Sequence, residues 1–235
     1  MPDFAFTARE LRRWSDVPSD IDAGLAKVED ATHVTLGDVA QMASSAAAMY
    51  ALRCLDCFDD QVRLRVAQVV TLAAGRAGRL ISDGRITALA DAWAAAFTPG
   101  QAIDRARIDA AAAELTPVLQ HISSSPADDA LRILYWALDI ARYERPAGVE
   151  LIDHPEAYFN FYHPDHTRTE GRFRTELSTW AEMALAAAHN FAYEAGLDDA
   201  TAGDTSRAEA MAASERQHQA RDIVAVFPPR LAAAT

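Results

Sequence analysis

The sequence predicts an all-α protein, an irregular or orthogonal bundle of about eight to ten helices with no significant sheet. Apolar residues recur at three- and four-residue steps over most of the chain, which is the period of an amphipathic helix. No segment shows the period-two alternation between turn residues that predicts strands. No repeat of fixed period is found either, so an irregular bundle is favoured over a regular solenoid.

The strongest periodic segment is residues 61–81, and its buried positions hold a 3.6-residue period over five turns. They are Val62, Val66, Val69, Val70, Ala73, Ala77, Leu80 and Ile81. After Thr35, an alanine-rich stretch with the same period predicts one long helix to about Phe58. The helix that follows "SSSPADD" has apolar residues on two faces, so we expect it to be central and covered on both sides.

Capping and helix-ending residues set the expected boundaries. The pairs that predict capping boxes are Thr7 with Glu10, Ser19 with Asp22, and Ser206 with Glu209, while Ser125 and Pro126 predict the start of another helix. We expect Pro117 to kink or break a helix over 103–122. Gly196 lies at the predicted C-terminal end of a long helix that begins near Phe173.

The connections are short, which predicts one helical domain over residues 1–235. A subdomain break remains open near 98–102 or 123–127. The last helix is polar nearly all round, which leaves open a peripheral position for residues 197–235.

Charge limits the plausible partners. The chain has 34 acidic and 22 basic residues and a net charge of −12, which favours a basic protein partner and disfavours general nucleic-acid binding. No apolar stretch reaches the roughly 18 residues of a membrane span, and no signal peptide is indicated, so we expect no membrane association and a cytoplasmic location. The excess of Arg and Ala, with Lys27 as the only lysine, is typical of a GC-rich bacterial genome.

Residues 54–60 combine thiol and carboxylate side chains. Cys54 and Cys57 form a C-x-x-C motif among aspartates. No second cysteine pair completes a tetrahedral zinc site, so we interpret both as packed thiols inside a helix. Asp56, Asp59 and Asp60 resemble a magnesium-binding cluster, but capping of the next helix explains Asp59 and Asp60 equally well.

A basic block spans residues 61–100. Within it Arg76, Arg79 and Arg85 could gather an anion, with Gly75 and Gly78 allowing close backbone approach. We favour the other interpretation, in which the glycines allow two helices to cross closely and the arginines form a solvated face.

The segment "HPEAYFNFYHPDH", residues 154–166, is the best candidate for a ligand site. Its aromatic and histidine residues, together with Trp136, form the predicted ligand-binding or partner-binding set: Trp136, Tyr158, Phe161, Tyr162, His163 and His166. His163, Asp165 and His166 are the candidate metal ligands, although a single H-x-x-H interrupted by proline is a weak zinc signal. The alternative is an aromatic plug that closes the helical core.

The sequence contains no recognisable catalytic motif. It therefore favours a non-enzymatic acidic protein that has no cofactor and binds another protein. Bacterial immunity proteins and antitoxins are examples of this class. The first alternative is a small-molecule-binding or metal-dependent enzyme, with zinc or another divalent metal, built around residues 154–166. The second is an oligomeric scaffold subunit that self-associates through the small residues of 43–51 or 73–78.

Overall fold

The computed structural model describes residues 4–13, 19–80, 84–95, 105–119, 126–142, 170–197 and 204–231. In chain order the elements of these ranges are β1 (Ala5–Thr7), α1 (Ala8–Arg12), α2 (Ser19–Leu25), β2 (His33–Thr35), α3 (Leu36–Met42), α4 (Ser45–Ala51), the 3₁₀ helix η1 (Leu52–Cys54), α5 (Asp60–Leu80), α6 (Gly84–Ala95), α7 (Arg105–Leu119), α8 (Pro126–Arg142), α9 (Glu170–Leu197) and α10 (Ser206–Val226). The predicted all-α bundle is confirmed, because β1 and β2 form the only sheet in the described ranges.

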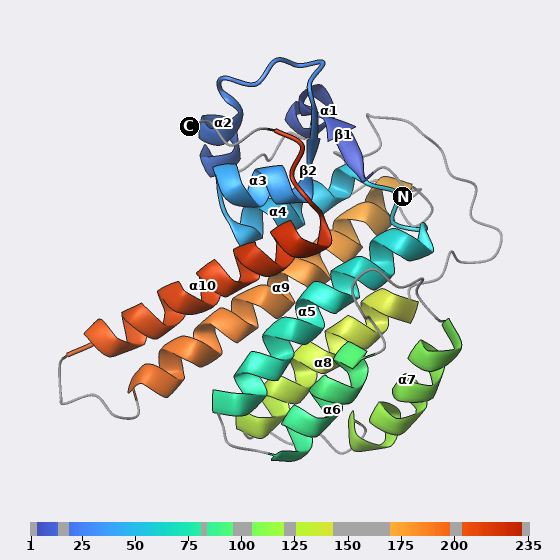
Figure 1. Ribbon diagram of the computed structural model, residues 1–235, viewed down its shortest axis with the longest axis vertical. Coiled ribbons are helices and arrows are strands. Elements are labelled where there is room, and N and C mark those ends of the chain that lie inside the picture. The colour runs from blue at the N-terminus through green and yellow to red at the C-terminus, as the bar shows by residue number, and fades with distance from the viewer. Residues whose placement is uncertain are drawn as a thin grey trace.

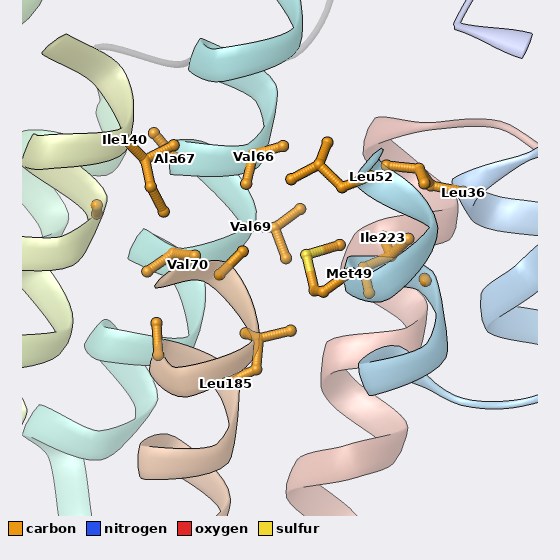
Figure 2. Close-up of a cluster of buried hydrophobic side chains, with 14 of the residues drawn as sticks. Leu36, Met49, Leu52, Val66, Ala67, Val69, Val70, Ile140, Leu185 and Ile223 are labelled. Atoms are coloured by element: carbon orange, nitrogen blue, oxygen red, sulfur yellow. The ribbon is translucent and has the colours of Figure 1, made fainter. Parts of the chain in front are cut away.

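Helix α5 is the central element of the bundle, with α6, α8, α9 and α10 packed around it (Figure 1). Its predicted buried positions are confirmed from Val62 to Ala77. Leu80 is 38% exposed, which corrects its predicted burial, and Ile81 lies outside the described residues. Figure 2 shows side chains of α4, η1, α5, α8, α9 and α10 meeting in one apolar cluster around Val66, Val69 and Val70. Each fully buried valine of this kind contributes about 1.5–3 kcal/mol of transfer free energy, so the core depends on α5.

Helix α8 has the predicted central position. It packs against α5 and α9, and to a lesser extent against α6 and α7. Both of its apolar faces are buried, with Leu131, Leu134 and Leu138 on one and Ile133 and Ile140 on the other. The helix begins at Pro126 as expected, since the missing N–H of proline costs nothing at that position.

The N-terminal sheet has two short strands, and the helix that follows each strand is capped. β1 and β2 are antiparallel with Phe6 opposite Val34, and each strand runs directly into a helix. Thr7 accepts a hydrogen bond from the Glu10 amide at 3.2 Å while Glu10 accepts one from the Thr7 amide at 2.6 Å, which confirms the first capping box. Thr35 and Asp38 form a second box of the same kind.

The helix predicted over residues 35–58 is broken, which corrects the sequence expectation. The backbone of Ala43 leaves helical geometry at φ −131° and ψ −91°, and Ser44 then caps α4 by accepting from the Ala47 amide at 3.0 Å. A 3₁₀ turn follows α4, and Leu55 is extended. The C-x-x-C is therefore not inside a helix: Cys54 ends η1 and Cys57 lies in the following turn.

Other predicted boundaries differ by a few residues. Helix α7 covers Arg105–Leu119 of the helix predicted over 103–122, whose remaining residues lie outside the described ranges, and Pro117 lies in its last turn. Ser19 and Ser206 are first helical residues, so neither forms the predicted capping box; at α10 the cap position is Thr205, and the Asp204 carboxylate accepts from the Ser206 amide. No helix in the described ranges is long and apolar enough to cross a membrane.

Helices α9 and α10 form an antiparallel hairpin, and its two ends nearest the connection extend beyond the other helices (Figure 1). Gly196 allows this pairing, because a Cβ atom there would lie 2.4 Å from the Cα of Ala208. The other half of α10 packs against α3, α4 and α5. Although its sequence is mostly polar, α10 buries Glu215, Gln219 and Ile223 among other residues.

Candidate interaction surface and buried polar clusters

Trp136 is the only member of the predicted ligand set that falls in the described residues. It is half-buried on α8 and packs against the core, and its part in ligand or partner binding stays a prediction. Its neighbour Tyr135 is 45% exposed. Burial raises the pKa of Asp139, one turn further along α8, while a hydrogen bond from Tyr135 and the charge of Arg142 oppose that shift.

The remaining residues of that set lie outside the described ranges: Tyr158, Phe161, Tyr162, His163, Asp165 and His166. Their interpretation as a ligand site, a metal site or a plug therefore stays a prediction. In the described part of the chain, no group of three or more His, Cys, Asp or Glu side chains is arranged to hold a metal ion.

The aspartates beside the cysteines cap the turns around the start of α5. Asp59 Oδ1 accepts from the Gln61 amide at 2.7 Å and Asp56 Oδ1 from the Phe58 amide at 2.9 Å. Asp60 pairs with Arg63. Cys57 is buried and Cys54 half-buried, and neither forms a disulfide bond, which confirms their interpretation as packed thiols.

Arg76 is paired rather than solvated, which corrects the predicted arginine face at that position. Its Nε and Nη2 donate to the two carboxylate oxygens of Glu215 at 2.7 and 3.0 Å, and Nη1 donates to Asp222 at 2.6 Å. Arg79 is exposed, 3.8 Å from Asp91, as a surface arginine would be. Beside them, a Cβ at Gly75 would meet the Cβ of Ala90 of α6 at 3.5 Å, an ordinary van der Waals contact, so α6 lies next to Gly75 but the packing does not require a glycine there.

The Arg76 cluster holds one positive and two negative side chains between α5 and α10. Attraction to Glu215 and Asp222 outweighs burial and raises the pKa of Arg76. Burial raises the pKa of Asp222, and the charge of Glu215 adds to this effect while Arg76 opposes it. The cluster fixes how α10 sits on α5, and each of the three guanidinium nitrogens donates to a carboxylate of α10.

A second polar chain joins this cluster to α4 and α9. Gln219 donates through Nε2 to the carbonyl of Leu185 at 2.9 Å and to Glu215 at 3.1 Å, and its Oε1 accepts from Ser45 at 3.0 Å. The donors and acceptors of the amide are thus used within the protein, which is what a buried glutamine requires. Like the Arg76 cluster, these hydrogen bonds hold α10 in place, here against α4 and α9.

Arg53 forms a third buried polar contact. Its guanidinium lies over the ring of Tyr50, 4.0 Å from the centroid, and its Nε donates to Ser178 at 3.3 Å. Ser178 in turn donates to Glu182 at 2.8 Å. This contact fixes the turn after α4 against α9.

One face of α9 is exposed from Thr179 to Leu197. We call this row the α9 outer face; it consists of Thr179, Met183, Ala186, Asn190, Glu194 and Leu197, all of them exposed and spaced three or four residues apart. Met183 is 48% exposed and Leu197 38% exposed, two of the four large apolar side chains that stand out among the described residues. Core packing does not account for large apolar side chains that are exposed, so this row is a candidate binding surface.

The charge along this face is negative. Between Glu176 and Leu197 the helix carries Glu176, Glu182 and Glu194 and has no Arg or Lys. Glu194 has no hydrogen bond or ion pair with any described residue. A mixed row that exposes Met183 and Leu197 together with the Glu194 carboxylate is complementary to a basic, amphipathic surface.

One edge of the face is fixed by His189. Its Nδ1 lies 3.1 Å from the carbonyl of Ala212, and its Nε2 lies 2.8 Å from a guanidinium nitrogen of Arg216. A guanidinium can only donate, so Nε2 accepts and Nδ1 carries the proton in this arrangement. The contact joins α9 to α10 where the hairpin projects.

Comparison of the chain with protein-family models, with curated proteins and with solved structures finds no match in any of the three. No family's active site is therefore transferred to this chain.

Sequence reasoning missed the α9 outer face, although its signal was present. The apolar period from Leu177 to Phe191 located the buried side of α9. Met183 and Leu197 do not belong to that apolar period. A large apolar side chain at each position was therefore the signal of a second, outward-facing row.

Proposed function

We propose that the protein is a non-enzymatic helical protein that binds another protein of basic character through the α9 outer face. The observation that carries the proposal is the exposure of Met183 and Leu197 beside Glu194, on a stretch of α9 from residue 176 to residue 197 that has acidic residues and no Arg or Lys. Methionine adapts its shape to different partners, and carboxylates beside it would steer a basic partner and set its orientation. An acidic immunity protein or antitoxin from a bacterium, acting in the cytoplasm, is the class that fits this description.

The polar clusters support the proposal indirectly. Among the residues considered for chemistry in the described ranges, Asp59, Cys57 and Arg76 are engaged in caps, core packing and ion pairs. The enzyme alternative therefore rests on residues 154–166, which lie outside the described ranges. Zinc at one equivalent in the purified full chain, lost in both His163→Ala and His166→Ala, would favour that alternative.

The scaffold alternative loses the surfaces that sequence analysis assigned to it. Ala47, Ala48 and Ala51 are buried within the chain, as are Ala73 and Ala77. These small residues are used for packing among helices of the same chain. Self-association would need a different surface.

The test is affinity capture from the organism's own extract with matched variants. We expect the full-length wild type to recover a stoichiometric basic partner. The double variant Met183→Arg/Glu194→Arg should bind that purified partner on the order of a hundredfold more weakly, because it loses both the central apolar contact and the charge complementarity. Titration calorimetry of the purified pair gives the two dissociation constants.

A matched control is Leu80→Arg/Asp22→Arg, which makes the same two kinds of change at exposed positions on α5 and α2. The control should bind like the wild type. Equal binding by all three proteins, or an acidic partner, would show the proposal to be wrong.

A further inference from the structure

The chain crosses the start of α3 after α10 ends. Residues 227–231, which we call the C-terminal clasp, begin with Phe227, whose side chain is fully buried and packs edge-on against Phe4 with ring centroids 5.6 Å apart. Arg65 of α5 donates to the carbonyl of Val226 at 3.0 Å and lies over the Phe4 ring. The entry to the clasp is thus fixed by α5 and by the N-terminal segment together.

Asp38 closes the clasp. Its carboxylate is buried, and it accepts from the backbone amides of Arg230 at 3.0 Å and Leu231 at 2.8 Å. The same carboxylate accepts from the Thr35 amide at 2.8 Å, and Thr35 Oγ1 lies 3.1 Å from the carbonyl of Pro228. Hydrogen bonds to an ionised acceptor are stronger than neutral ones, so a few backbone donors suffice to hold an extended chain end.

Gly37 allows the clasp to approach the helix. A Cβ atom at this position would lie 2.0 Å from the carbonyl oxygen of Phe227 and 3.2 Å from the nitrogen of Pro229. No other residue fits without displacing the backbone of the clasp.

Few elements attach the N-terminal unit, which we define as residues 4–13 and 19–42, to the rest of the protein. Its strands, α1 and α2 contact mainly one another and α3, apart from a smaller contact of α1 with η1. Helix α3 makes the main contacts outward, with α4 and α10, and it is the helix that the clasp crosses. The main attachment of this unit to the bundle is therefore α3, and smaller contacts add to it, such as Phe4 against Arg65 of α5 and Asp20 with Ser44.

We propose that the C-terminal clasp is a releasable lock that holds the N-terminal unit closed against α10, and that the unit opens separately from the bundle when Asp38 loses the amides of residues 230 and 231. Separate opening follows from the distribution of contacts, since α5, α8 and α9 keep their mutual packing when α3 moves. This lock is independent of the proposed binding at the α9 outer face.

Amide hydrogen exchange of the full-length protein tests the lock. Gly37→Ala displaces the clasp without removing a donor or acceptor, and Leu231→Pro removes one donor at the chain end. In both variants we expect the amides of residues 33–42 to exchange on the order of tenfold faster, with α5 and α8 unchanged. Trypsin should also release residues 231–235 faster from Gly37→Ala than from the wild type, because the bond it cuts joins the two residues held by Asp38.

The matched control is Gly84→Ala, where the added Cβ would have no neighbour within 4 Å. It should behave like the wild type in both measurements. Should Gly37→Ala not fold, Leu231→Pro decides alone, since it changes only the end of the clasp. Unchanged exchange of residues 33–42, or equally faster exchange throughout α5 and α8, would overturn the proposal.

Discussion

Arg76 shows how a single residue can be misjudged from its sequence neighbours. Its spacing from Arg79 is typical of a solvated helix face, yet its two partners lie 139 and 146 residues further along the chain. Nothing in the sequence near Arg76 indicates such a distant ion pair. By contrast, the Thr7 and Glu10 capping box was predictable, because both partners lie within one helical turn.

Within this cluster we predict that Asp222→Asn is as stable as the wild type at pH 7 or more stable. The pKa of Asp222 is raised in the folded protein, so its ionisation costs stability as pH rises above the ordinary value of 3.8, and asparagine avoids that cost. The advantage of the variant should therefore grow from pH 3 to pH 7, as measured by urea unfolding at each pH.

The control for this prediction is Arg76→Met, which leaves Glu215 and Asp222 together without a counter-charge. We expect it to lower the free energy of unfolding by about 3–5 kcal/mol. A large loss in Asp222→Asn at pH 7 would contradict the prediction and would show that the attraction to Arg76 outweighs burial.

At the scale of elements, hydrophobic period predicted α5 and α8 well, since each helix is long and its buried side is continuous. The break between α3 and α4 was not predictable in this way, because the apolar spacing continues through it. Ser44 accepts from an amide of α4 and also donates to Asp20 of α2 at 3.0 Å. That second contact depends on tertiary structure, which local sequence does not reveal.

The α9 and α10 pairing leads to a prediction at Gly196. Substitution by alanine would favour an isolated helix by about 1 kcal/mol, yet here the new Cβ would lie 2.4 Å from the Ala208 backbone. We expect Gly196→Ala to lower the free energy of unfolding by about 1–3 kcal/mol, because α10 must move away. Gly84→Ala is the matched control and should be neutral or stabilising in the same urea titration; a stabilised Gly196→Ala would contradict the close packing.

For the whole molecule, the sequence predicted the fold class but not the order in which helices pack. Amphipathic helices are compatible with many arrangements, and the choice depends on contacts such as Gly196 against Ala208 and Arg76 against Glu215. The same limit applies to function. The sequence showed a net charge of −12 and placed Met183, Glu194 and Leu197 on one predicted helix, but only the fold shows that this side of α9 is exposed.

That net charge leads to a prediction about salt. Raising ionic strength from about 0.01 M to about 0.1 M shortens the Debye length from about 30 Å to about 10 Å and screens the repulsion among surface carboxylates. We expect the unfolding midpoint to rise by about 2 °C, while affinity for the proposed basic partner falls over the same range. Asp22→Arg reduces the net charge from −12 to −10 and should show a smaller rise in midpoint. A midpoint that falls with added salt would mean that exposed ion pairs, and not net repulsion, dominate the electrostatic free energy of the folded state.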